Sequence, residues 1–417
     1  MGIETNLTLA LFGGVVLLLS LFSSAFQRMS LPGPVLALVS GVLIGPFALD
    51  LLRIEDLAQD PRMLLEEGAR LTLAVGLAGV ALRLPHGYWR RNLRWVLVII
   101  GLGMPLMLVV ATGVLTVAAG APFLLALLVG AIITPTDPVV STPIVTGSLA
   151  EERIPERVRH NISSESGVND GLGYLFVMLP VLLITAPDAA WRDLLGTVLL
   201  REVLGGAAFG ALAGYCLGKL FTMARRRSLM EESAYLGFLV PLALAVLGVA
   251  KLMGTNDLLA VFVAAAVFGQ VIPQRDEAQE DKVEDAVNRL FLLPIFVLFG
   301  MALPIEEWLA LGWSVPLALL AAVLLRRLIT IWSLRPLIRG LHTRPETFFL
   351  SWFGPIGVSA LFYATMAERL TGDERVFVLV SLAITLSVVV HGLTTAPLSA
   401  WLERRWNRNT HETRSTH

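Results

Sequence analysis

The side chains most able to carry chemistry lie together in one apolar run that is long enough to span a lipid bilayer. The run contains the sequence Ser163-Ser164-Glu165-Ser166-Gly167-Val168-Asn169-Asp170-Gly171. At 3.6 residues per helical turn, Ser163, Ser166 and Asp170 share one face, and Glu165 and Asn169 form the adjacent stripe. A carboxylate at mid-depth costs about 2.5–3.5 kcal/mol or more, so we expect both acids to pair or to line a water-filled cavity. Hydrogen bonding between helices is the alternative role for the hydroxyl and amide groups.

Another acidic residue lies where a second apolar run is interrupted. The interruption reads Thr134-Pro135-Thr136-Asp137-Pro138. Two prolines within four residues remove helical hydrogen bonds and leave backbone groups unpaired in a medium without water. We expect the positive end of a half-helix to attract the Asp137 carboxylate, and freed carbonyl groups such as that of Thr136 to be able to coordinate a cation. An ordinary N-cap is the alternative for Asp137, and it is compatible with the first role.

A matching interruption occurs late in the chain, and the spacing of the two is informative. It reads Phe353-Gly354-Pro355-Ile356-Gly357. Seven expected helices separate corresponding positions in the two halves, and because seven is odd the second half would be inverted in the membrane. Paired broken helices are typical of inverted-repeat transporters, whose site lies near the midplane where the two breaks cross.

Two adjacent arginines, Arg326 and Arg327, lie near the middle of another apolar run. An unpaired guanidinium at that depth would be prohibitive, so we expect one of them to pair with Glu165. For Arg326, snorkelling to the cytoplasmic interface is the alternative.

The elements that must position these residues are membrane helices. Of the 417 residues, 55% are hydrophobic and only 16% are charged, whereas a soluble domain carries about 25% charge. This composition excludes a large soluble enzymatic or ligand-binding domain. A net charge of -1 argues against a nucleic-acid partner, and the single cysteine, Cys216, excludes disulfide frameworks and thiolate metal clusters.

Apolar runs of spanning length predict an all-α polytopic membrane protein with about 13 transmembrane helices. The runs lie at residues 6–26, 31–49, 64–83, 94–118, 122–148, 158–184, 195–222, 232–251, 256–272, 285–303, 312–340, 345–368 and 374–402. Most of the 32 Lys and Arg residues fall in loops on one side of this arrangement. The positive-inside rule makes that side cytoplasmic, with the N-terminus outside and the C-terminus cytoplasmic, in a multi-pass protein of the plasma (inner) membrane.

The chain is accordingly expected to divide into four parts. Residues 1–184 form a first inverted repeat, 185–230 a connector helix, 231–402 a second inverted repeat, and 403–417 a cytoplasmic tail. The two broken helices near 134–138 and 353–357 would cross at mid-membrane.

In this order and at this depth the motifs resemble the monovalent cation–proton antiporter superfamily. Within it the chain is similar to the NhaP and sodium–hydrogen exchanger branch, and in detail to the fungal plasma-membrane sodium(potassium)–proton antiporters. The motifs that carry the resemblance are Thr136-Asp137-Pro138, Glu165 to Asp170, the basic pair, and Phe353 to Val358. The resemblance runs from about Glu67 to Pro397. It implies an NhaA/NhaP-like fold in a homodimer, with a six-helix core domain and a dimerisation domain.

The resemblance also implies roles for individual residues. Asp170 would bind cation and proton alternately, and Asn169 stands where electrogenic relatives have a second aspartate. Ser166, Thr136 and Asp137 would help to ligate or position the ion, so that Na+ would lie at Asp170, Ser166 and Thr136.

Two further roles concern the surroundings of that site. Glu165 and Arg327, or Arg326, would form a structural ion pair beside it. Many relatives have arginine where this chain has Ile356, so the role of that arginine does not transfer.

The expected function is therefore secondary antiport of Na+, Li+ or K+ against H+ by alternating access, without a cofactor. Burial opposes the ionised form of Asp170 and a bound cation stabilises it, so cation and proton would exclude each other. Because Asn169 replaces a second acid, we expect one cation per proton and no net charge movement. The alternatives are a cation channel or a polytopic membrane enzyme, either a lipid-modifying enzyme or a protease using Glu66 and Glu67. Otherwise Glu67 would add a carboxylate to the cavity.

Three other features are expected to be structural. Asn256 reads as a helix cap, and His391 as a packing or hydrogen-bonding residue with pH sensing as the alternative. Glycines at every fourth position form a smooth stripe for close helix packing, with a dimer contact as the alternative. They are Gly206, Gly210, Gly214 and Gly218.

Overall fold

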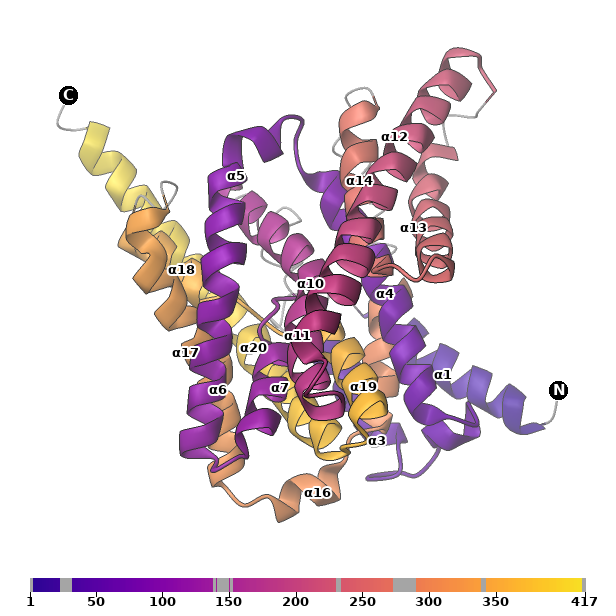
Figure 1. Cartoon of the computed structure of the whole chain (residues 1–417). Helices are drawn as coiled ribbons and strands as arrows, with labels where there is room; N and C mark the ends of the chain where they lie inside the picture. The colour runs from indigo at the N-terminus through magenta and orange to yellow at the C-terminus, as the bar shows by residue number, and fades with distance from the viewer. Residues whose placement is uncertain are drawn as a thin grey trace.

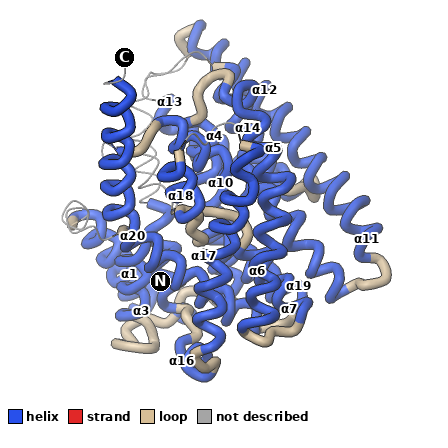
Figure 2. Tube along the Cα trace, turned by 90° about the vertical axis from the view of Figure 1, so that its left-hand side faces the viewer, coloured by secondary structure: helices blue, strands red, loops and turns tan. Residues whose placement is uncertain are grey.

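The computed structural model describes residues 3–22, 32–137, 140, 150, 153–229, 234–272, 290–338 and 343–414. Within these ranges the ordered elements are helices and there is no strand (Figure 2). Pro138, the last residue of the first expected break, lies outside the described residues.

The helices of the first half begin near the N-terminus and end with α10. They are α1 (Ile3–Leu21), α3 (Gly33–Ile44), α4 (Pro61–Arg83), the continuous helix α5–η2–α6 (Tyr88–Val98, Ile99–Gly103, Met104–Ala118), α7 (Phe123–Ile133) and α10 (Glu156–Thr185).

The remaining helices are the long connecting helix and those of the second half. They are the connector α11–η3–α12 (Ala190–Asp193, Leu194–Leu204, Gly205–Arg226), α13 (Ala234–Leu252), α14 (Asp257–Val271), a helix at Leu290–Met301, α16 (Ile305–Ala310), α17 (Ser314–Leu334), α18 (Arg344–Trp352), α19 (Val358–Thr371) and α20 (Arg375–Arg414).

Each of the thirteen expected runs contains a helix, which confirms the all-α membrane fold. Among the described residues, five helices are by themselves long and apolar enough to cross a bilayer. They are Tyr88–Ala118, Glu156–Thr185, Ala190–Arg226, Ser314–Leu337 and Arg375–Arg405. The other apolar helices are shorter, so the exact number of thirteen spans remains a prediction.

Both expected breaks are present in the described backbone. Helix α7 ends at Ile133, and residues 134–137 are not helical, while residues 353–357 separate α18 from α19. The two irregular segments meet, because the Asp137 amide donates to the Pro355 carbonyl oxygen at 2.8 Å. Figure 1 shows α7, α10, α19 and α20 in the centre of the molecule, where this crossing lies.

The glycine stripe packs one helix of the chain against another. A Cβ at Gly206 would come 2.5 Å from the Asn256 carbonyl oxygen. At Gly210 and Gly214 it would overlap the carbonyl oxygens of Ala260 and Ala264. The stripe on α12 therefore touches the backbone of α14, which confirms its role in close helix packing. Because α14 covers this face, a dimer contact through the stripe is wrong.

Two ion pairs join α4 to the far end of α19. Arg369 binds Glu66 through two bonds, Nη2 to Oε1 at 2.6 Å and Nε to Oε2 at 3.0 Å. Arg62 Nε lies 3.4 Å from Glu368 Oε2. These pairs fix α19 beside α4 at the end of α19 opposite to the break.

Candidate functional site

Asp170 lies at the centre of the molecule on α10 and has no exposed surface. Neither of its carboxylate oxygens accepts a hydrogen bond from any residue that the structure describes. Its backbone carbonyl, in contrast, accepts a bond from the Tyr363 hydroxyl on α19. Buried polar atoms in proteins almost always have partners. A fully buried carboxylate without one is therefore placed to receive a cation or a proton.

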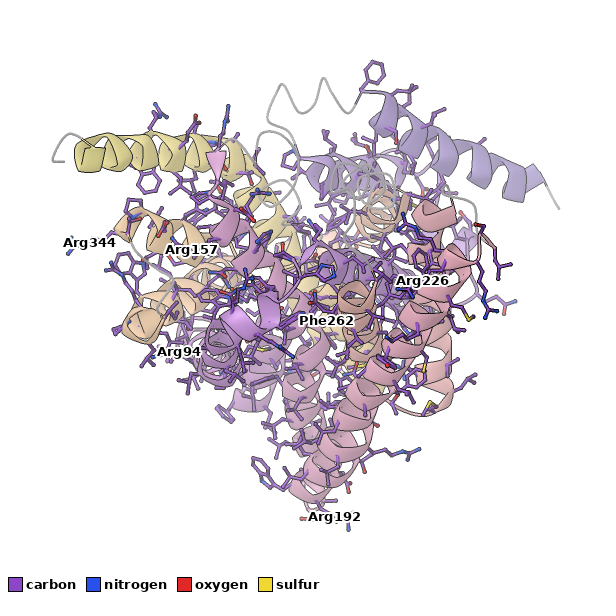
Figure 3. All side chains as sticks on the ribbon, turned by 90° about the horizontal axis from the view of Figure 1, so that it is seen from above. Arg94, Arg157, Arg192, Arg226, Phe262 and Arg344 are labelled. Carbon is purple, nitrogen blue, oxygen red and sulfur yellow. The ribbon has the colours of Figure 1, made fainter. Side chains whose placement is uncertain are left out.

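Close packing around α10 keeps this carboxylate away from water. A Cβ at Gly171 would come 2.9 Å from the Leu259 side chain, and one at Gly173 would come 2.6 Å from the Pro135 ring. At Gly167 it would overlap the ring of Phe262, which lies near the centre of the molecule in Figure 3. The glycines thus let α14 and the first break approach α10 on both sides of Asp170.

Thr136, Ser166 and Asn169 form one hydrogen-bonded group between the first break and α10. The Thr136 and Ser166 hydroxyl oxygens are 3.1 Å apart. Asn169 Oδ1 accepts from the Thr136 amide at 3.2 Å, and Asn169 Nδ2 donates to Thr136 Oγ1 at 2.8 Å. All three side chains are buried. The amide of Asn169 thus holds the break, and the two hydroxyl groups are brought together at Ser166, one helical turn before Asp170 on the same face of α10.

Asp137 caps the half-helix that follows the second break. Its Oδ2 accepts hydrogen bonds from the Val358 amide and, at 3.3 Å, from the Ser359 amide. Its Oδ1 accepts from the Val140 amide at 3.0 Å. The carboxylate therefore lies at the positive N-terminal end of α19, where a negative charge is stabilised. In this position its oxygens stabilise the crossing of the two breaks by hydrogen bonds to backbone amides.

Glu165 and Arg327 form a bidentate ion pair beside the site. Arg327 Nη1 binds Glu165 Oε1, and Arg327 Nη2 donates to Glu165 Oε2 at 2.9 Å. Arg327 Nε also donates to the Leu350 carbonyl in the last turn of α18, at 2.7 Å. The structure thus gives the tandem arginines different partners and assigns Glu165 to Arg327.

Arg326 does not snorkel, because its side chain is completely buried. Its Nη1 donates to the Thr134 carbonyl at 2.7 Å, and its Nη2 donates to the Gly354 carbonyl at 2.8 Å. One guanidinium therefore satisfies carbonyl groups of both breaks, at the negative ends of α7 and α18. This role of Arg326 was not predicted from the sequence, although two broken helices imply unpaired carbonyl groups and a buried cation nearby could have been assigned to them.

His391 serves the same end of α18. Its Nε2 lies 3.0 Å from the Trp352 carbonyl, and its Nδ1 lies 2.9 Å from the Ser387 carbonyl. Its hydrogen-bonding role is confirmed by these contacts. Asn256 also acts as expected, since its Oδ1 accepts from the Leu259 amide at 3.0 Å and caps α14.

Glu67, which was expected to add a carboxylate to the cavity, forms an ion pair within its own helix. Its side chain is 44% exposed, and its Oε2 is 2.6 Å from Arg70 Nη1. Arg70 also binds Asp257, at 2.7 Å. Glu66 is taken by Arg369, so the two glutamates of the protease alternative point to different arginines. Among the described residues, no three His, Cys, Asp or Glu side chains converge as a metal site.

Comparison with solved structures shows which fold this is. The sodium–proton antiporter MjNhaP1 of Methanocaldococcus jannaschii, solved at pH 8, superposes with a TM-score of 0.72 and 19% identity. The match covers 96% of this chain and 99% of that one. The chain therefore has the NhaP-type fold.

Comparison with known sequences is consistent with that fold. A Na+/H+ antiporter of Schizosaccharomyces pombe is 29% identical over 95% of this chain and 91% of its own length. Na+/H+ antiporter 2 of Zygosaccharomyces rouxii is also 29% identical, over 93% of this chain, which spans 51% of that longer protein. The model of the family described as "Sodium/hydrogen exchanger, transmembrane" matches residues 14–401. With nearly its whole length matched, the chain belongs to the sodium/hydrogen exchanger family.

Proposed function

We propose that this protein exchanges Na+ for protons across the plasma membrane, with cation and proton competing for Asp170. The observation that carries the proposal is the buried Asp170 carboxylate, whose oxygens have no partner among the described residues. The two broken helices meet at Asp137 and Pro355, and the hydroxyl groups of Thr136 and Ser166 are 3.1 Å apart, with Ser166 one helical turn before Asp170 on α10.

The chemistry of exchange follows from the cost of burying charge. An ionised carboxylate in a site without water is strongly disfavoured unless a cation is bound to it, and a protonated carboxyl group is neutral. Na+ is a hard cation that prefers oxygen ligands such as carboxylate, hydroxyl and carbonyl oxygens. Asp170 would supply the charge, and Thr136 and Ser166 would supply neutral ligands. Asn169 would position the site, because its amide is already bonded to Thr136.

Membership of the exchanger family makes the chain a secondary transporter and not an enzyme, with monovalent cations and protons as its substrates. We propose that it requires no cofactor and works as a homodimer by alternating access. The two repeats, 1–184 and 231–402, would be inverted relative to each other and joined by the connector 185–230. A core containing α10, α17 and α19 would move when Asp170 is neutralised by Na+ or H+.

We also propose that the N-terminus faces outward and the C-terminus faces the cytoplasm. The start of α5 carries Arg90, Arg91 and Arg94, and the end of α12 carries Arg225 and Arg226. Both lie at one end of the bundle, with the end of α20, whereas α16 lies at the opposite end (Figure 1). The positive-inside rule makes the arginine-rich end cytoplasmic.

The test of function is a transport assay on the purified full-length chain in proteoliposomes that carry an imposed proton gradient. Adding Na+ outside should collapse the gradient, reported by recovery of a pH-sensitive dye, and adding Li+ and K+ would rank the cations. The Asp170→Asn variant should be inactive. Asp188→Asn, the same substitution at an exposed position after α10, is the matched control and should be active. Exchange retained by Asp170→Asn would refute the assignment of the site.

The same vesicles test the stoichiometry. A single carboxylate with a neutral Asn169 beside it implies one cation per proton and no net charge movement. The steady-state proton gradient should then be unaffected by a potassium–valinomycin potential. A gradient that follows the imposed potential would overturn the electroneutral cycle and leave Na+/H+ exchange itself intact.

A further inference from the structure

Ser359 carries a buried polar group for which the site described above has no role. It is the second residue of α19, directly after the second break, and it has no exposed surface. Its amide is fixed by Asp137 Oδ2 at 3.3 Å. Its hydroxyl oxygen, however, has no hydrogen-bond partner in the part of the chain that the structure describes. As the second residue of α19, Ser359 has no preceding helical turn to bond to, and the carbonyl four residues earlier, that of Pro355, accepts the Asp137 amide.

The register of α19 against α10 places that hydroxyl at Asp170. Tyr363 lies one turn after Ser359 on the same face of α19, and its hydroxyl donates to the backbone carbonyl of Asp170. One turn nearer the break, the Ser359 hydroxyl faces the Asp170 carboxylate and interacts with it, although the two do not form a hydrogen bond of normal geometry. The two oxygens of Asp170 and the oxygen of Ser359 are therefore three neighbouring buried oxygens, and none of them is bonded to any other group among the described residues.

The electrostatics at this end of α19 permit a cation there. The N-terminal end of a helix is positive and would repel Na+. Here the Asp137 carboxylate accepts hydrogen bonds from the backbone amides of both Val358 and Ser359. The negative charge of Asp137 thus compensates the positive N-terminal end of α19. The Ser359 hydroxyl oxygen therefore remains available to bind a cation.

We infer that Ser359 is a cation ligand, so that the second break supplies an oxygen to the transported ion together with Asp170 on α10 and the hydroxyl groups at the first break. The inference rests on the proposed exchange of Na+ for H+. The Na+ ion would then be bound by oxygens from both α10 and α19. A proton, in contrast, would need only one oxygen of Asp170. Occupancy by Na+ should therefore depend on Ser359 much more than occupancy by H+ does.

The experiment compares Ser359→Ala with wild type and with Ser381→Ala. Ser381 is also fully buried, but on α20, where its hydroxyl donates to the Val378 carbonyl at 3.1 Å. Loss of one oxygen that faces a charge should raise the Na+ concentration for half-maximal exchange about tenfold or more, with little change in the maximal rate. Ser381→Ala should leave it unchanged. The thermal unfolding midpoint without Na+ should be similar in all three proteins, and the stabilisation by added Na+ should need about tenfold more Na+ only in Ser359→Ala.

A second variant covers the case in which Ser359→Ala does not fold. Ser359→Cys preserves the volume and places a soft sulfur where Na+ prefers a hard oxygen, so it should show the same loss of affinity. A half-saturating Na+ concentration within twofold of wild type in either folded variant would overturn the assignment of Ser359 alone. Absence of Na+-driven exchange in the wild-type protein would overturn the proposed function, and the inference with it.

Discussion

Neutralising the two buried carboxylates of α10, Asp170 and Glu165, should affect stability differently, although we expect both changes to abolish exchange. Asp170 accepts no side-chain hydrogen bond from the described residues, so Asp170→Asn loses no such bond and removes the cost of a buried acid. Its free energy of unfolding should stay the same or rise by about 1 kcal/mol. Glu165→Gln instead breaks a buried bidentate pair with Arg327. Leaving one buried charge uncompensated costs about 3–5 kcal/mol.

The assay is thermal unfolding of the purified variants in one detergent at fixed pH, with and without Na+. At this chain length 1 kcal/mol corresponds to about 1–2 °C in Tm. Asp170→Asn should therefore have a Tm equal to or slightly above that of wild type, and Glu165→Gln should have one about 3–10 °C lower. Wild type should gain about 2.7 kcal/mol from Na+ at 100 times its Kd. Asp170→Asn should gain nothing, because it lacks the charge that binds the ion.

Two results would refute this reasoning. If Asp170→Asn lowered the Tm as much as Glu165→Gln, Asp170 would be a structural partner and not an unpaired ligand. If Asp170→Asn were still stabilised by Na+, the cation would bind elsewhere. Monodisperse elution of each variant is the control for correct folding.

Three further tests concern the crossing and its surroundings. Gly357→Ala would bring a Cβ within 2.8 Å of the carboxylate that caps α19, so it should cost about 1–3 kcal/mol of stability and most of the exchange. Gly248→Ala, which meets nothing within 4 Å, should change neither, and equal effects would contradict the clash. Arg326→Lys keeps the charge but loses the planar fork that reaches two carbonyl groups, and we expect about 1.5–3 kcal/mol less stability by denaturation; an unchanged midpoint would argue against the double contact. Replacing Glu66 and Arg369 by Gln, singly and together, should give a coupling energy of about 1 kcal/mol or less, because the Arg369 side chain is 48% exposed.

The helices could be predicted from the sequence because the membrane imposes a strong rule. Each apolar run must form its own backbone hydrogen bonds, so run length and hydropathy locate helices without knowledge of their neighbours. The breaks were equally accessible, since Pro135 and Pro355 each lie in an otherwise continuous run. Helix ends were predicted less accurately: the connecting helix begins at Ala190, whereas its apolar run was expected from residue 195.

The partners of the buried charges could be predicted only in part. Burial cost alone indicated that Glu165 needs an arginine, but two adjacent arginines satisfy that condition equally. Their directions differ by about 100° around α17, and only the packing of α7, α10 and α18 decides which one faces Glu165. The ion pair between Glu67 and Arg70, one turn along the same helix, was likewise not predicted, while the cavity role of Glu67 stays a prediction.

The proposed role of Ser359 could not be predicted from the sequence for a different reason. Serine is common in membrane helices, and its hydroxyl normally bonds within its own helix. Its importance depends on the absence of that bond and on the distance to Asp170, which lies far away in the chain. The only local signal was its place directly after the second break, one turn before a tyrosine.

Backbone groups exposed by the two breaks are bonded by side chains that include Asp137, Asn169, Arg326, Arg327, Ser387 and His391. On the proposed assignment, architecture and ion recognition belong to separate residues: these side chains keep the crossing intact, while Asp170 and the neighbouring hydroxyl groups would bind the ion. Such a separation makes the protein a favourable scaffold for altering ion selectivity. Exchanging Ser166 or Ser359 for other small polar residues would vary the ligands within an unchanged frame, so libraries at these two positions should retain folded protein while sampling preferences among Li+, Na+ and K+.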